Sequence, residues 1–306
     1  MIYRTRRHIV LPVLLLGTGC LSYQNFDSTG HLREQDVQRV GAQTAASIEV
    51  PFEITPELRT TLEQRIRQAP SERSKSNEVV RFIFEDLDLT YSLTPTRNAV
   101  TAFETQKGNC LSFVNLFVGI AREQGLDPFY VEVTDYQKWN HREGMVVSQG
   151  HIVAGMYLEG ELKTYDFLPY RPKAYKAFNP IDDLKAAAHY YNNLGAEALM
   201  AGDLQKAREH LQIATGIAPE FEKALNNMGV ALARSGESGP ALEMYQKGLA
   251  IDPENINTLE YLGEAYLTKG RVDLAIGQLA RIEEISGTDS VQYLELAIAI
   301  TEGGSW

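Results

Sequence analysis

Three residues of this 306-residue sequence have the side-chain types that nucleophilic catalysis uses: Cys110, His151 and Asp166. A cysteine thiolate attacks a carbonyl carbon, a histidine moves the proton, and a carboxylate orients the histidine ring. Together they would carry out acyl transfer, in which an amide or ester carbonyl passes through a thioester to water or to an amine. The residues are 41 and 15 positions apart, so the prediction depends on the elements that position them.

Cys110 follows Gly108 and Asn109 at the point where an apolar helical pattern begins. In the first turn of a helix, unpaired N–H groups and the helix dipole favour negative charge and therefore a thiolate. The alternative is that Cys110 is a small apolar residue at the start of a core helix. If a base and a residue that orients it lie within reach of Cys110, the interpretation of Cys110 as a nucleophile is favoured.

Two strands are predicted, over residues 152–158 and 162–167. His151 stands at the head of the first strand, and Asp166 lies on the second. Glu159 and Gly160 between the strands suit a two-residue hairpin turn. Such a turn places Asp166 opposite Val153 and diagonal to His151, about 7–8 Å away at the backbone. A turn one residue longer would put the two side chains on opposite faces, so the site depends on the turn.

Other interpretations of these residues stay open. His141, in a loop-like stretch, is an alternative base, although no strand carboxylate is placed to orient it. Asp166 is an alternative hydrogen-bonding group for the end of the hairpin. One cysteine without a close second ligand is weak support for zinc, so we expect no metal and no cofactor.

The order and spacing of these residues resemble the transglutaminase-like family, whose core is related to papain. The segment Gly108-Asn109-Cys110, with Leu116, Ala121 and Gly125 after it, resembles the nucleophile segment of that family. The resemblance covers roughly residues 50–170 and implies an α+β domain, placed at residues 51–175. It also implies that Cys110 is the nucleophile, His151 the general base and Asp166 the residue that orients it. The oxyanion hole is unassigned beyond the backbone N–H of Cys110.

Further elements of this domain follow from apolar spacing and helix-start signals. We expect one helix that begins at Thr55-Pro56-Glu57 and a second that follows Ser76. Residues 129–134 have a strand-like pattern. Residues 168–185 contain three prolines and show no clear period, so we expect a connector there, placed at residues 176–187.

The C-terminal part repeats with a period of 34 residues. Leu194-Gly195, Met228-Gly229 and Leu262-Gly263 keep this step, as do Ala207, Ala241 and Ala275. The period and the small residues resemble the tetratricopeptide repeat. The resemblance implies an all-α solenoid over residues 188–306, with three helix pairs and a terminal capping helix near residues 291–300.

The same resemblance implies a concave groove formed by the first helix of each repeat. Its fifth position is Asn192, Asn226 or Glu260 in successive repeats. Asparagine is a poor helix former, so its recurrence at the 34-residue step favours a role in binding a protein or peptide partner. Solvated asparagines without a partner are the alternative.

The N-terminus predicts export. Three arginines precede a short apolar run over residues 9–16, and Gly17-Thr18-Gly19 leads into Cys20. The pattern resembles a bacterial lipoprotein signal over residues 1–19, with lipid on Cys20 and a polar tether over residues 20–50. Leu21 stands where an aspartate retains many such proteins at the inner membrane. We therefore expect a cell-envelope protein that faces the periplasm, at the outer rather than the inner membrane.

The acidic balance, 40 acidic against 29 basic side chains, argues against nucleic acid as a partner. The sequence thus predicts a lipid-anchored, cysteine-dependent acyl-transfer enzyme, of the peptidase, amidase or transglutaminase type, with repeats that recruit a protein. The alternatives are a catalytically idle lipoprotein scaffold for envelope assembly and a binding domain that uses the same cleft without turnover.

Overall fold

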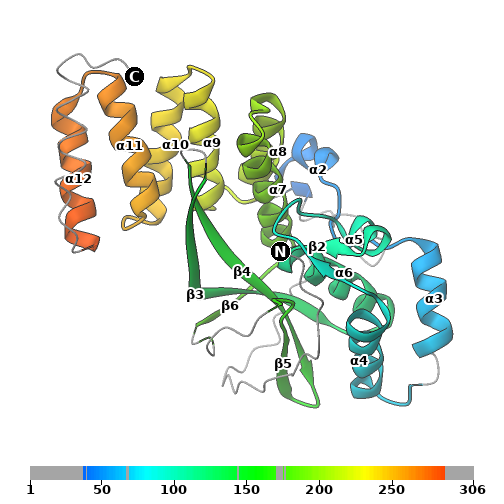
Figure 1. Cartoon of the computed structure of the whole chain (residues 1–306). Coiled ribbons are helices and arrows are strands. Elements are labelled where there is room, and N and C mark those ends of the chain that lie inside the picture. The colour runs from blue at the N-terminus through cyan, green and yellow to red at the C-terminus, as the bar shows by residue number, and fades with distance from the viewer. Residues whose placement is uncertain are drawn as a thin grey trace. The chain divides into compact units, whose positions relative to one another are not determined.

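The computed structural model describes residues 37–38, 40–66, 69–142, 145–169, 175 and 177–286. The chain divides into two compact units, Met1–Tyr190 and Tyr191–Trp306 (Figure 1). The predicted signal segment, Cys20 and the predicted capping helix lie outside the described residues. Of the helices in the described ranges, none has both the length and the apolar character needed to cross a membrane.

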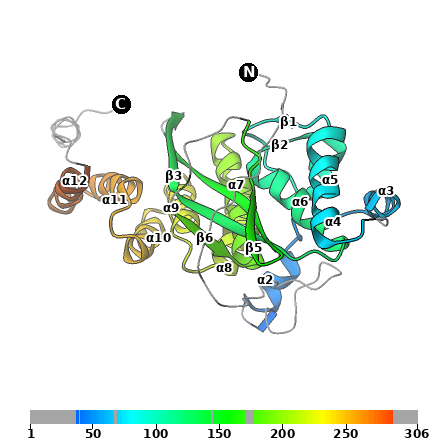
Figure 2. The ribbon, with the colours of Figure 1, turned by 90° about the horizontal axis from the view of Figure 1, so that it is seen from below.

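Helices dominate the first half of the N-terminal unit, and α4 and α5 gather around α6 (Figure 2). The helices are α2 (Ala42–Ser47), α3 (Pro56–Ile66), α4 (Glu72–Arg81), the π-helix η1 (Phe82–Asp86), α5 (Ala99–Thr105) and α6 (Cys110–Glu123). Two short parallel strands, β1 (Thr90–Tyr91) and β2 (Lys107–Gly108), precede α6. The start of α3 at a proline confirms the prediction.

The core helix of this unit is α6, in which every residue from Leu111 to Ala121 is buried. Most of these residues are apolar, as expected for a helix that neighbouring elements cover on all sides, and the buried polar residues among them are Ser112 and Asn115. Gly119 is required at one of these contacts, since a Cβ atom there would lie 2.1 Å from the carbonyl oxygen of Phe52. The helix is therefore held in one place, which fixes the position of its first residue, Cys110.

A four-stranded antiparallel sheet forms the second half of this unit. Its strands are β3 (Pro128–Arg142), β4 (Met145–Leu158), β5 (Glu161–Tyr165) and β6 (Phe178–Ile181), in the order β5-β4-β3-β6. Glu159 and Gly160 both have positive φ, 54° and 82°, as a type I′ turn requires. Leu158 pairs with Glu161 and Ala154 with Tyr165, so the predicted turn and register are confirmed.

The two faces of the sheet have different neighbours. Tyr130 donates a hydrogen bond to Asn115 of α6, and the Tyr165 ring lies 4.5 Å from that of Phe117, also of α6. These residues therefore share the face that packs on α6. A cluster on the other face contains Phe129, Val131, Val133, Val153 and Leu162, with Tyr175 and Phe178 packed against it.

Several predicted boundaries differ from the structure. The expected connector over residues 176–187 contains β6, which pairs with β3, and the start of α7. The second helix begins at Glu72, before Ser76, because Ser71 caps it by accepting a hydrogen bond from the Ser74 N–H. β3 and β4 continue beyond residues 129–134 and 152–158 as a two-stranded ribbon (Figure 1). The expected tether contains α2.

A buried ion pair joins α6 to the start of α7 within the N-terminal unit. The guanidinium of Arg122 binds both carboxylate oxygens of Asp183, at 2.8 Å each. The Asp183 side chain is fully buried, and the Arg122 guanidinium also lies 4.7 Å from the centre of the Phe52 ring. Such a bidentate pair fixes orientation as well as distance.

The C-terminal part consists of helix pairs, as predicted. The helices are α7 (Asp183–Met200), α8 (Leu204–Ile217), α9 (Glu222–Arg234), α10 (Ser238–Ile251), α11 (Ile256–Thr268) and α12 (Val272–Ser286). Gly202, Gly236 and Gly270 follow the first helix of each pair with φ of 76°, 82° and 69°. These left-handed positions, again 34 residues apart, end the helices.

The small residues of the repeat allow two helices to approach closely. A Cβ atom on Gly195 would lie 2.5 Å from Leu211, and one on Gly229 would lie 2.4 Å from the Tyr245 ring. At Gly263 the nearest atom would be 3.8 Å away. The first two glycines are therefore required by packing, whereas the third repeat leaves room for a side chain.

Candidate active site

Cys110 is the first residue of α6, and Asn109 caps that helix. The Asn109 side-chain oxygen accepts hydrogen bonds from the backbone N–H of Ser112 and from its hydroxyl, both at 3.0 Å. Gly108 must be small, because a Cβ atom there would lie 2.6 Å from Cβ of Ser112. The residues around Cys110 thus present the thiol at the positive end of the helix dipole.

The Asn109 amide also binds the loop that precedes α5. Its Nδ2 donates to Oγ1 of Thr96 at 2.7 Å, in a buried contact. The backbone N–H of Arg97 donates to the Ser112 hydroxyl at 2.8 Å. An asparagine before the cysteine therefore has a structural role, since one side chain caps the helix and fastens the loop beside it.

His151 and Asp166 contact each other as the predicted register requires. Oδ1 of Asp166 lies 2.9 Å from Nε2 of His151. The His151 side chain is 1% exposed and that of Asp166 28%. β5 ends at Tyr165, so Asp166 is the first residue beyond the strand and its carboxylate meets the ring where the ladder ends.

Two more groups hold the Asp166 carboxylate. The backbone N–H of Leu168 donates to Oδ1 at 2.9 Å, and the Tyr175 hydroxyl donates to Oδ2 at 2.7 Å. The Tyr175 ring also lies 5.4 Å from the His151 ring, tilted by 45°. Sequence patterns did not single out Tyr175, because it stands in an aperiodic segment where no motif marks it.

Burial and hydrogen bonding act in opposite directions on His151. Burial lowers the pKa of the ring, but hydrogen bonds with Asp166 and Cys110 and the charges of both raise it to about 9. For Asp166, burial raises the pKa, yet the hydrogen bonds from His151 and Tyr175 and the backbone bond from Leu168 leave it below its ordinary value. At neutral pH the site therefore holds an imidazolium beside a carboxylate.

The ring nitrogens of His151 face different partners. Asp166 occupies Nε2, and Nδ1 is enclosed in the protein. Nδ1 is therefore the nitrogen that remains for proton exchange with the Cys110 sulfur, and Cys110 is one of the groups that raise the pKa of the ring.

The other candidate residues have different outcomes. The side chain of His141 lies outside the described part, so its role as an alternative base stays a prediction. Within the described ranges, no three His, Cys, Asp or Glu side chains are grouped as a metal site would need.

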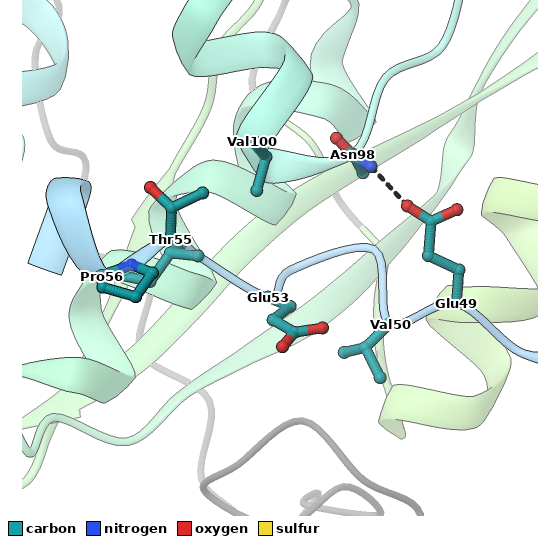
Figure 3. Close-up of a pocket in the computed structure, with 8 residues that line it drawn as sticks. Glu49, Val50, Glu53, Thr55, Pro56, Asn98 and Val100 are labelled. Carbon is teal, nitrogen blue, oxygen red and sulfur yellow. Dashed lines mark hydrogen bonds between the residues drawn. The ribbon is translucent and has the colours of Figure 1, made fainter.

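A pocket of about 220 Å³ lies elsewhere in the N-terminal unit (Figure 3). It is lined by Glu49, Val50, Glu53, Ile54, Thr55, Pro56, Asn98 and Val100, none of which is a candidate catalytic residue.

The predicted groove residues of the repeats are mostly buried. Asn192 is 7% exposed and its Oδ1 accepts a hydrogen bond from Nδ2 of Asn227 at 2.9 Å, so the repeats use this atom to bond to each other. Asn226 is 8% exposed, and its buried Oδ1 has no hydrogen-bond partner among the described residues. Glu260 is half-buried. The side-chain oxygen of Asn192 is thus already used within the repeats, whereas that of Asn226 has capacity to accept a hydrogen bond.

Comparison with family models gives a match to part of the chain. Residues 60–172 match the family model of the Transglutaminase-like superfamily, a range that includes Cys110, His151 and Asp166. A search among curated proteins found no match.

Solved structures resemble the chain in part. A crystal structure of MamA protein is 28% identical, covers 34% of this chain and 61% of its own, and has a TM-score of 0.31. A mutant O-GlcNAc transferase from Thermobaculum terrenum is 22% identical and has a TM-score of 0.35. The match covers 36% of this chain and 22% of the transferase chain. The first tetratricopeptide domain of Spaghetti (RPAP3), bound to an HSP90 peptide, is 14% identical and has a TM-score of 0.36. The match covers 38% of this chain and 94% of the Spaghetti chain.

The chain spans 61% and 66% of two MamA chains, less than two thirds of each. The helix pairs at a 34-residue step form the repeated architecture that the sequence predicts. The family match and the helix pairs together give an α+β domain of transglutaminase-like fold and an all-α part of tetratricopeptide-like repeats.

Proposed function

We propose that the protein is a cysteine-dependent acyl-transfer enzyme with Cys110 as nucleophile, His151 as general base and Asp166 as the residue that orients the ring. The observation that carries this proposal is the 2.9 Å contact between Asp166 and Nε2 of His151, on a ring whose pKa Cys110 also helps to raise. Nucleophile, base and orienting group in such contact are the arrangement that activates a thiol.

The proposed reaction has two balanced halves. Cys110 reacts as the thiolate of a thiolate–imidazolium pair, in which the thiol proton already resides on His151, and the sulfur forms a bond to the substrate carbonyl carbon. The bond from that carbon to the leaving nitrogen or oxygen then breaks as His151 returns the proton to the leaving group, which leaves a thioester on Cys110. Water or an amine attacks the thioester and gives its proton to His151, and the sulfur departs as the acid or the new amide forms.

The first experiment separates hydrolysis from transfer. The purified chain is incubated with a glutamine-containing peptide, with and without a biotinylated primary amine, and ammonia, peptide acid and biotinylated peptide are measured. Either product from the wild type, and none from Cys110→Ala or His151→Ala, supports the enzyme. Peptide-bond cleavage in a peptide library is measured in parallel. If neither experiment gives product that depends on Cys110, the protein is the idle scaffold or a binding domain.

For the repeats we propose binding of a protein or peptide partner along the first helices. Asn226 supports this proposal, since its buried Oδ1 lacks a hydrogen-bond donor among the described residues and a partner N–H would supply one. The test is capture from an envelope extract by the wild type and by Asn192→Ala with Asn226→Ala. Specific partners lost from the folded double variant support the groove; unchanged partners leave the repeats as a spacer.

We also propose that lipid on Cys20 anchors the protein in the cell envelope, facing the periplasm and at the outer membrane. The signal-like sequence before Cys20 supports this. Membrane fractionation and mass spectrometry of Cys20→Ala in the source cell provide the test. A soluble, unlipidated variant is the expected result, and an unchanged membrane fraction would overturn the anchor.

A further inference from the structure

Tyr175 is the residue of this site that lies farthest along the chain. It stands nine residues after Asp166 and three before Phe178, the first residue of β6. Phe178 pairs with Val133, which pairs with His151 on its other side. Phe178, Val133 and His151 thus form one row across the sheet, and β6 brings the chain back to the row that holds the catalytic ring.

Packing holds the Tyr175 ring over that row. Its centre lies 5.4 Å from that of His151 and 6.0 Å from that of Phe178, in an edge-on arrangement of 86° with the latter. The ring packs against the cluster that includes Val133 and Val153. These apolar contacts fix the ring without its hydroxyl, so the hydroxyl is available for a polar role.

The hydroxyl binds the carboxylate of Asp166. It donates to Oδ2 of Asp166 at 2.7 Å, while Oδ1 receives His151 Nε2 and the Leu168 N–H, both at 2.9 Å. A carboxylate held only through Oδ1 can turn about its Cβ–Cγ bond. With Oδ2 held as well, Oδ1 stays directed at Nε2.

We propose that Tyr175 is a positioning residue, whose hydroxyl fixes the Asp166 carboxylate so that Asp166 in turn fixes the His151 ring against Cys110. This inference rests on the proposed function, because it assigns Tyr175 a part in the same site. The bond from Tyr175 also lowers the pKa of Asp166, which keeps the partly buried carboxylate ionised beside the ring.

The test uses Tyr175→Phe in the full chain, which removes only the hydroxyl and keeps the ring contacts. The first readout is the Nε2 proton of His151 in ¹⁵N-histidine-labelled protein, which has six histidines, assigned with His151→Gln. We expect a hydrogen-bonded resonance in the wild type that exchanges with solvent about tenfold faster in Tyr175→Phe. The second readout is the rate of Cys110 alkylation by iodoacetamide, mapped by mass spectrometry, which we expect to fall about tenfold at neutral pH.

Two controls separate positioning from general stability. Tyr130→Phe also removes a buried hydroxyl, the donor to Asn115 at 3.0 Å, and must leave both readouts as in the wild type. In an Asp166→Asn background, Tyr175→Phe must cause no further loss of alkylation, since Tyr175 acts through the carboxylate. A further loss there, or wild-type readouts in Tyr175→Phe alone, would overturn the proposal.

The outcomes also distinguish this inference from the proposed function. If wild-type Cys110 alkylates no faster than Cys110 in His151→Ala, the enzyme proposal fails, while the Nε2 proton still reports whether Tyr175 holds the pair. If Tyr175→Phe does not fold, biosynthetic replacement of tyrosine by fluorotyrosine keeps the shape and makes the phenol a stronger donor. The Nε2 resonance must then shift, and an unmoved resonance would overturn the inference.

Discussion

Asp166 and His151 are in hydrogen-bond contact, 2.9 Å from Oδ1 to Nε2, because a two-residue turn joins the strands that carry them. The turn residues Glu159 and Gly160 both have positive φ, and the ladder beyond them is regular from Leu158–Glu161 to Ala154–Tyr165. The geometry of the site therefore depends on a turn far from the nucleophile in the sequence.

Lengthening that turn is expected to disable the site. One glycine inserted between Glu159 and Gly160 shifts the register by one residue and moves Asp166 to the other face of the hairpin. The Nε2 contact and the fast alkylation of Cys110 should both be lost. Glu159→Gly keeps the turn length and removes only the exposed ion pair with Arg73, so it should retain both. An insertion variant with wild-type alkylation would show that the register is not required.

Stability should depend on pH through His151. Its pKa is about 9 in the folded protein against an ordinary value of 6.5, so the stabilisation is fully present below 6.5 and is lost as pH rises through about 9. Urea unfolding of the wild type and of His151→Gln should show a difference in unfolding free energy that shrinks by up to about 3 kcal/mol over this range. A difference that is constant with pH would contradict the raised pKa.

The Arg122–Asp183 pair should be costly to break from one side. Asp183→Ala leaves a largely buried guanidinium without its carboxylate and should lower the unfolding free energy by about 3–5 kcal/mol in urea denaturation. The double change Arg122→Met with Asp183→Leu removes both charges and should cost less than Asp183→Ala alone. A double variant less stable than the single one would mean that the pair itself stabilises the fold.

The repeat glycines give a matched pair of substitutions. A methyl group at Gly229 meets the Tyr245 ring at 2.4 Å, whereas at Gly263 the nearest atom is 3.8 Å away. Gly229→Ala should therefore destabilise the protein by about 1–3 kcal/mol. Gly263→Ala should be neutral or stabilise by up to about 1 kcal/mol, because alanine is the better helix former. Thermal unfolding checks both, and equal effects would contradict the packing difference.

Local rules were sufficient for part of this architecture. The Glu159-Gly160 turn, the register after it and the start of α3 at Pro56 follow from backbone preferences within a few residues. The 34-residue step predicts the helix pairs because each repeat must bury the same face against its neighbour.

Long-range contacts were not readable in the same way. β6 contains a proline and owes its strand pairing to β3, a partner that no local pattern reveals. Tyr175 enters the site only because β6 returns there, so no local sequence pattern predicts its hydrogen bond to Asp166. The early start of α4 did have a signal, since Ser71 is a favoured capping residue, but the polar residues after it hid the apolar period.

The measurement that tests the central claim most directly is detection of an acyl group on Cys110. The full chain is mixed with p-nitrophenyl acetate, quenched in acid, and examined by peptide mass spectrometry, with and without hydroxylamine. We predict one acetyl group on Cys110 that hydroxylamine removes, formed at least about tenfold more slowly in His151→Ala and in Asp166→Asn. No acetyl group on Cys110, or one that forms equally fast without His151, would contradict the account.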